Sequence, residues 1–260
     1  MKSISLSKPI NICGRRIKNR IVVPPMSDFG TVAPDGLVHQ SHIDRYEAYA
    51  KGGAGLIIIE ACSVLRMPEN RDTLRLENDD CIPGIKSIAD IIHHYSAVTL
   101  VQIMLTGLKT MEEKKISEIS RDDFLRYKEA FISAAIRCQK AGADIIDVSS
   151  GIARYSNIPN NFLYDSKIYA ASLVKNHAHI PVICVGNIFT GNIGESIIDN
   201  EYADMIAVGR GHLSDPAWAN KTLAGVPVNQ CLQCKNCLWW IDGNLCAARR
   251  KEKQKNGISS

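Results

Sequence analysis

Four cysteines crowd into the last thirty residues of the chain, where the sequence reads CLQCKNCLWWIDGNLC. Cys231, Cys234 and Cys237 recur at every third position, and Cys246 follows after a longer gap. Closely spaced thiolates with a remote fourth are typical of the ligands of a [4Fe–4S] cluster. Four thiolates also suit a structural zinc ion. The sequence therefore predicts a metal centre in this tail. The preferred interpretation is an iron–sulfur cluster, and zinc is the alternative.

The rest of the composition is that of a single globular chain with a modest positive charge. No apolar run approaches the roughly 20 residues that span a bilayer, and the first residues lack the apolar core of a signal peptide. We therefore expect a cytoplasmic protein without a membrane segment, in which the other five cysteines are unlikely to form disulfides. The net charge of +4 is small, and the basic run from Arg249 to Lys255 is interpreted as a solvated surface. We do not expect nucleic-acid binding.

Continuous apolar runs alternate with segments of helical periodicity along the chain. Buried parallel strands have such uninterrupted apolar runs, because both of their faces are covered. The expected strands are 20–24, 55–61, 99–104, 144–149, 181–186 and 205–209. The expected helices are 41–51, 85–95, 121–140, 165–176, 191–200 and 215–224. This order predicts an α/β fold of parallel strands, derived from a TIM barrel but with about six βα units where a closed barrel needs eight.

Residues 1–227 are expected to form this barrel-like domain, and residues 228–260 a short cysteine-rich module. A closer reading of the first part is possible, because residues 17–64 read IKNRIVVPPMSDFGTVAPDGLVHQSHIDRYEAYAKGGAGLIIIEACSV. Its notable features are Asn19-Arg20, Pro25-Met26, Asp35-Gly36, Tyr46, Gly52-Gly53 and Gly55. Taken together, they resemble the Old Yellow Enzyme family of flavoproteins, in the branch similar to dienoyl-CoA reductase. Larger members of that branch also carry a cysteine run directly after the barrel.

The resemblance implies that the chain binds FMN. Pro25 and Met26 match the family's turn beneath the flavin, and Gln102 matches a glutamine that hydrogen-bonds the pyrimidine edge, to which an amide can both donate and accept. Ser27 and Ala61 match small residues near the ring. The positions that match the family's phosphate site are Gly186, Asn187, Gly209 and Arg210. Glycines let backbone N–H groups approach a phosphate, and arginine adds a charged fork.

The middle of the chain departs from the family pattern. After their long helix, family members have a strand that ends in a His-x-x-His or His-x-x-Asn pair, followed by a tyrosine. Here the helix leads directly into IIDVSSGIARYSN, which resembles a later strand. About two βα units are therefore expected to be missing at this junction, together with the substrate-binding histidines. Tyr155 and Arg154 follow this strand. We expect Tyr155 to serve as the proton donor and Arg154 to contact the flavin or an anionic substrate.

Two hypotheses follow for function. The first is an FMN-dependent oxidoreductase that transfers hydride at flavin N5, with the cluster as electron inlet. The second is an accessory or electron-transfer subunit that keeps its cofactors but has lost substrate chemistry. No GxGxxG fingerprint is present, so we expect an external reductant. The expected partners are a small-molecule substrate or a redox partner protein. Because an incomplete barrel exposes strand edges, we also expect a homo- or hetero-oligomer that covers them.

Overall fold

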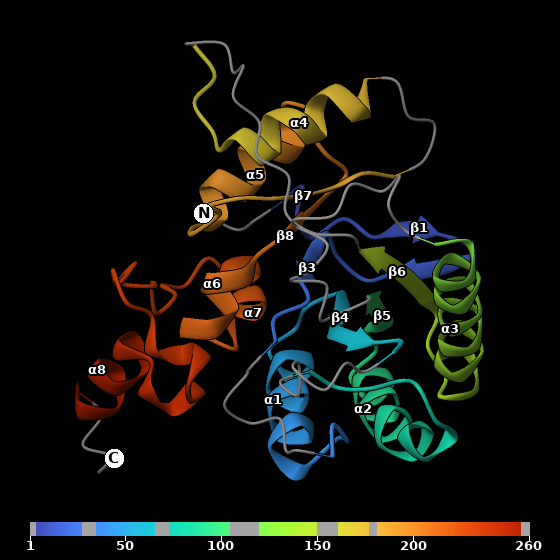
Figure 1. The fold of residues 1–260 in the computed structure, drawn as a ribbon. Helices are drawn as coiled ribbons and strands as arrows, with labels where there is room; N and C mark the ends of the chain where they lie inside the picture. Colours follow the sequence, from blue (N-terminus) through green and yellow to red (C-terminus); the bar gives the residue numbers. More distant parts are fainter. Residues whose placement is uncertain are drawn as a thin grey trace.

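The computed structural model describes residues 4–27, 35–65, 73–104, 120–149, 161–176 and 181–255. Within them, six parallel strands form one sheet, and helices cover its outer face (Figure 1). The strands are β3 (Ile21–Val23), β4 (Leu56–Ser63), β5 (Val98–Met104), β6 (Ile145–Ser149), β7 (Ile183–Val185) and β8 (Met205–Ala207). The predicted α/β class and parallel sheet are confirmed.

The strand order is β6-β5-β4-β3-β8-β7. The first parallel strand thus pairs with the last, through Ile21 beside Ile206 and Val22 beside Ala207. This pairing is the one that closes a barrel. In the described part of the chain the ring stays open between β6 and β7, which are the two edges of the sheet. The opening lies one strand later than the junction predicted from the sequence, since β6 follows β5 directly in register.

Side chains that point into the curve of the sheet form a small apolar cluster. Its members are Ile17, Val22, Leu56, Ile58, Val98, Leu100, Met205 and Ala207. A two-stranded hairpin, β1 (Ile10–Ile12) and β2 (Arg15–Ile17), packs against this cluster. The turn of the hairpin has positive φ at both Cys13 and Gly14, as a tight two-residue hairpin requires. The interior is therefore a packed core rather than a channel.

The helices cover the outer face over a larger apolar core that contains Tyr46, Tyr49, Ile57, Ile59 and Trp218. They are α1 (Gln40–Lys51), α2 (Ile82–His94), α3 (Arg121–Lys140), α4 (Ser166–Lys175), α5 (Gly191–Asp199), α6 (Gly209–Ser214) and α7 (Trp218–Ala224). Asp165 and Thr190 cap α4 and α5 by accepting backbone N–H bonds from Lys167 and Ile193. No helix in the described ranges is both long and apolar enough to cross a membrane.

Three features of the fold differ clearly from the sequence prediction. The second helix begins at Ile82, so that Pro83 and Gly84 lie in its first turn, where a proline is tolerated. The last predicted helix is split: α6 follows β8 at once, and α7 begins only at Trp218, after Asp215-Pro216. The hairpin β1–β2 was not predicted, because each strand has only three residues.

The cysteine tail contains two short 3-10 turns, η4 (Leu238–Trp240) and η5 (Gly243–Leu245), followed by helix α8 (Ala247–Lys255). It lies beside α6 and α7 at one side of the sheet (Figure 1). The termini of the described strands that carry the expected flavin contacts, β3 and β8, lead toward this side.

Candidate functional site

A cavity of about 380 Å³ opens at the carboxyl ends of β3, β7 and β8. It is lined by Pro24, Pro25, Met26, Asp165, Lys167, Val185, Gly186, Asn187, Ile188, Phe189, Ala207, Gly209, Arg210 and Leu213. Six of the predicted flavin residues therefore line the same cavity, although they come from three distant parts of the sequence. Parallel strands of a barrel end at the same face, which is where such sites are built.

The loop after β7 depends on glycine. Gly186 has φ of +142°, and a Cβ at this position would lie 2.8 Å from the Asp165 side chain. Asn187 follows with φ of +49°, and its Nδ2 donates to Asp165 Oδ2 at 2.7 Å. Asp165 thus fixes the loop through its carboxylate while it also caps α4. Asp165 was expected only as the first residue of a helix, and its place in this wall is a finding of the structure.

Gly209 stands on the opposite wall. A Cβ here would meet only Met26 Sδ and Pro24 Cγ, both at 3.5 Å, which is ordinary van der Waals contact. Backbone groups of Gly209 are therefore open to the cavity, and the protein itself would tolerate a methyl group. Any requirement for glycine at this position would come from what the cavity binds.

Arg210 supplies positive charge at the edge of the cavity. Its guanidinium donates to Asn187 Oδ1 and lies 4.8 Å from the centre of the Phe189 ring. The side chain is exposed, so it is accessible to an anion. Lys167 also lines the cavity and adds a second cation. The cavity can hold a phosphate through backbone amides and one arginine, which is chemistry that fits the phosphate of FMN.

The remaining predicted flavin residues lie at the same end of the sheet but are not among the residues that line this cavity. Ser27 follows Met26 and is half-buried, Ala61 is 9% exposed near the end of β4, and Gln102 is half-buried near the end of β5. This arrangement extends the site across β4 and β5, the direction in which a flavin ring would lie. Tyr155 and Arg154 lie outside the described residues.

The four tail cysteines line a second cavity, of about 310 Å³. Its other lining residues are Arg210, Leu232, Gln233, Asn236, Leu238, Leu245, Ala247 and Ala248. Cys231 Sγ accepts a hydrogen bond from the backbone N–H of Gln233 at 3.4 Å, the kind of contact that stabilises a thiolate. Since Arg210 lines both cavities, the cysteine cavity and the phosphate cavity are neighbours.

The four cysteines share this cavity, which the four thiolates of one metal centre require. Among the residues that the structure describes, no group of three or more His, Cys, Asp or Glu side chains is already arranged to hold a single metal ion. A donor set of four thiolates suits a [4Fe–4S] cluster and also a zinc ion.

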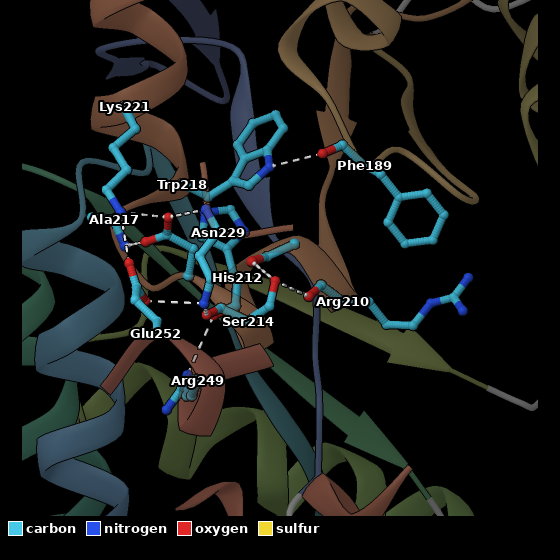
Figure 2. A network of polar contacts seen from close by, with 12 residues as sticks. Phe189, Arg210, His212, Ser214, Ala217, Trp218, Lys221, Asn229, Arg249 and Glu252 are labelled. Atoms are coloured by element: carbon cyan, nitrogen blue, oxygen red, sulfur yellow. Dashed lines mark hydrogen bonds and ion pairs between the residues drawn. The ribbon is translucent and has the colours of Figure 1, made fainter. Parts of the chain in front are cut away.

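A polar network fastens the tail to the barrel domain (Figure 2). At its centre is Asp215, which is 3% exposed and accepts from Lys221 Nζ at 2.7 Å and from the backbone N–H of Asn229 at 2.8 Å. Arg249 of α8 donates to the carbonyl oxygen of Leu213 at 2.5 Å. Glu252 accepts from Asn229 Nδ2 at 3.0 Å. The tail is therefore attached to α6 and α7 by bonds to fixed backbone groups.

A second attachment uses Trp239, which is 1% exposed. The guanidinium of Arg45 lies 5.8 Å from a Trp239 ring centre and 5.3 Å from that of Tyr46, and it forms an ion pair with the fully buried Glu60. Glu60 precedes Ala61 on β4, so this contact reaches from the tail to the strand that carries a predicted flavin residue. Neither Arg45 nor Glu60 was among the residues predicted from the sequence.

The described histidines do not replace the family's substrate-binding pair. His42 and His212 are both fully buried, and burial lowers the pKa of each to about 4, with the nearby Arg45 adding to the effect at His42. His212 Nδ1 bonds the carbonyl oxygen of Val208 at 2.6 Å. Neither these two nor His39, His93 or His94 is among the residues that line the two cavities.

Comparison with known proteins supports the family resemblance found in the sequence. The sequence profile of the NADH:flavin oxidoreductase / NADH oxidase family matches residues 5–155 and 152–229. The NADH oxidase of Thermoanaerobacter brockii is 24% identical over 334 residues, which cover 84% of this chain and 51% of that protein. The NADPH dehydrogenase of Bacillus pumilus is 32% identical over 161 residues, covering 55% of this chain and 47% of that protein.

The fold is similar to that of solved structures as well. A 2-naphthoyl-CoA reductase superposes with a TM-score of 0.74 at 15% identity, over 92% of this chain and 56% of that one. The chain spans about half the length of the curated relatives that it matches. The alignment with the NADH oxidase uses about 218 of the 260 residues of this chain, which is 84%. About 116 of its 334 positions are therefore gaps in this chain. The chain belongs to the NADH:flavin oxidoreductase / NADH oxidase family.

Proposed function

We propose that the chain is an FMN-dependent oxidoreductase whose tail carries a [4Fe–4S] cluster as electron inlet. The observation that carries the proposal is the cavity at the ends of β3, β7 and β8, where Gly186, Gly209 and Arg210 surround an opening suited to a phosphate. Membership of a flavin oxidoreductase family supports the same cofactor. When bound, FMN accepts and donates hydride at N5, which is the redox chemistry that the protein directs.

The residues of the chain would divide the work of holding the flavin. Arg210 would turn from Asn187 toward the phosphate, because a dianion is a stronger partner than an amide oxygen. Pro25 and Met26 would support the ring from the end of β3. Gln102 would donate to and accept from the pyrimidine edge, since an amide offers both groups. Ser27 and Ala61 would lie near the ring.

The cysteine cavity supports the electron-inlet part of the proposal. Cys231, Cys234, Cys237 and Cys246 supply the four thiolates that a cubane requires. Arg210 contributes to the walls of this cavity and of the phosphate cavity, so the two redox groups would be close neighbours. Trp239 and the network around Asp215 would hold the cluster at a fixed distance from the flavin.

A specific observation favours the second hypothesis, an accessory electron-transfer subunit. None of the described histidines lines the flavin cavity, and the two buried ones are held neutral within the helical layer. The roles expected for Tyr155 and Arg154 remain predictions. Stopped-flow mixing of reduced protein with unsaturated carbonyl compounds separates the hypotheses, because an enzyme oxidises its flavin on mixing and an accessory subunit does not.

Gly209→Ala tests the flavin cavity directly. The protein tolerates the added methyl group, since its nearest neighbours would be 3.5 Å away, but the methyl group would occupy the cavity. We expect the melting temperature of the apoprotein to be unchanged and FMN affinity to fall at least tenfold, measured by fluorescence titration. Gly142→Ala is the control for a loss of stability alone: Gly142 has φ of +85° in the turn after α3, where alanine is strained, so we expect a lower melting temperature with unchanged FMN affinity. Unchanged FMN affinity in Gly209→Ala would argue against the cavity as the phosphate site.

We also propose that a second copy of the chain pairs with this one through α3, the helix that leads into the edge strand β6, and so covers the open side of the barrel. The exposed face of α3 carries Leu125, Ile132 and Ile136, which are 44–49% exposed and seven and four residues apart, hence on one side of the helix. In an antiparallel pairing, the acidic Glu129 would lie near the basic Lys140 of the second copy. Sedimentation should give a dimer at micromolar concentration and a monomer for Ile132→Asp. A monomeric wild-type protein would refute the pairing.

A further inference from the structure

The positive charge of the chain is concentrated in its cysteine tail. Residues 228–260 contain six Lys and Arg against two Asp and Glu, a net charge of +4, which equals the net charge of the whole chain. The first 227 residues therefore carry no net charge. The cations of the tail are Lys235, Arg249, Arg250, Lys251, Lys253 and Lys255.

Helix α8 divides these charges between two sides. Ala248 is buried, Arg249 donates to the backbone of α6, and Glu252 contacts Asn229 and Lys221, so this side faces the barrel domain. Ala247 is exposed and lines the cysteine cavity. Arg250 and Lys251 are exposed and come three and four residues after Ala247, so they share its side of the helix. Two cations thus point to solvent beside the cysteines.

The mouth of the cysteine cavity is apolar. Leu232 and Leu238 line the cavity and are 51% and 44% exposed. Ile241, close by in sequence, is 61% exposed. Lys235 lies between Cys234 and Cys237 and is exposed. An apolar centre with a charged rim is typical of transient protein interfaces, where the charges steer the encounter and the apolar contacts hold it briefly.

We infer that this surface, formed by Leu232, Lys235, Leu238, Arg250 and Lys251, docks an acidic one-electron carrier protein. The inference rests on the proposed function, because the docked carrier would deliver its electron to the cluster. In each encounter the carrier loses one electron and the cluster gains one, with no bond made or broken. Two encounters supply the electron pair of one hydride, whose proton comes from solvent. A nucleic acid would match the charge but not the exposed leucines.

The test uses charge reversal on the anaerobically reconstituted holoprotein. Arg250→Glu with Lys251→Glu inverts the surface beside the cysteines. Lys51→Glu with Lys86→Glu is the matched control, because both lysines are exposed, lie on α1 and α2, and give the same change in net charge. The probe is a reduced acidic [2Fe–2S] ferredoxin, and stopped-flow absorbance follows cluster reduction. A photoreduced deazaflavin serves as the small-molecule reductant.

We expect the reversal to lower the second-order rate constant with ferredoxin about tenfold at low salt, with the difference vanishing near 0.5 M salt. The control pair should stay within about twofold, and the deazaflavin should reduce all variants equally. Arg250→Gln with Lys251→Gln should give an intermediate rate with an unchanged circular dichroism spectrum. Reversal with a wild-type rate and salt dependence would overturn the inference.

Two further measurements test the docking surface independently of the cluster. Isothermal titration of zinc-free apoprotein with oxidised ferredoxin at low salt measures docking without electron transfer, so it remains informative if the protein holds no iron. We expect binding that the reversal weakens about tenfold. If wild-type protein ignores ferredoxin but binds duplex DNA or RNA in a manner that the reversal abolishes, the surface is a nucleic-acid site and the inference fails.

Discussion

Asp215→Asn should loosen the cysteine tail from the barrel domain. The carboxylate is 3% exposed and accepts three hydrogen bonds, from the backbone N–H groups of Ala217 and Asn229 and from Lys221 Nζ. An amide of the same shape keeps one acceptor oxygen, and its NH₂ group faces donors. Figure 2 shows the polar network to which Ala217, Lys221 and Asn229 belong.

The size of the effect follows from these bonds. Removal of one partner of a buried ion pair lowers the free energy of unfolding by about 3–5 kcal/mol. A hydrogen bond to a charged group contributes about 1.5–3 kcal/mol to the same quantity. Lys221 is 30% exposed, so water can solvate its ammonium when the carboxylate is lost, and we discount the cost to about 2–3 kcal/mol. For a chain of this length the melting temperature should fall by about 8 °C.

Differential scanning calorimetry measures the fall in melting temperature, and limited proteolysis at 20 °C shows which part of the chain is loosened. We expect cleavage of the variant within the tail before cleavage of the barrel domain. Asp242→Asn is the control: its carboxylate accepts only from the Asn244 backbone N–H in η5, a capping role that asparagine fills equally well. A melting temperature within 2 °C of wild type, together with an unchanged cleavage pattern, would mean that the network around Asp215 does not hold the tail.

Three further predictions concern the two cavities and a buried histidine. Gly186→Ala should release FMN on gel filtration, because the new Cβ would lie 2.8 Å from Asp165 and displace the loop after β7; retention of the flavin would count against that loop. Cys246→Ser should lower the iron content measured with a chromogenic chelator, and full iron would assign the fourth ligand elsewhere. Because the pKa of His212 is about 4 against about 6.5 unfolded, the unfolded state binds more protons between these values, so stability is complete above pH 6.5 and decreases as pH falls. Urea unfolding at pH 7 and pH 5 should differ by about 2 kcal/mol from this residue, and His212→Asn should remove that difference; an unaltered pH dependence in the variant would refute the attribution.

Much of the barrel could be predicted because its strands are buried on both faces. The runs around Val22, Ile58, Val101 and Ile206 are apolar without interruption, and only the strands of a covered parallel sheet have that pattern. The wall residues Gly186, Gly209 and Arg210 could be assigned only through the family resemblance, since glycine alone does not distinguish a turn from a ligand site.

The remaining features depend on tertiary contacts that leave no local pattern. Asp165 reads as a helix cap, yet its carboxylate also fixes Asn187 across the cavity. Glu60 reads as a polar residue in an apolar strand, but it is fully buried against Arg45. The boundary predicted after residue 227 separates the cysteines by composition, while Asn229 and Arg249 bond to α6 and join the two parts.

The proposed function requires a flavin and an iron–sulfur cluster side by side in this chain. Anaerobic purification, followed by absorption spectroscopy and metal analysis, measures both cofactors in one sample. We predict about one FMN and about four iron atoms with four acid-labile sulfides per chain, with flavin bands on a broad cluster absorbance. A colourless protein with one zinc ion and no flavin would contradict both cofactor assignments.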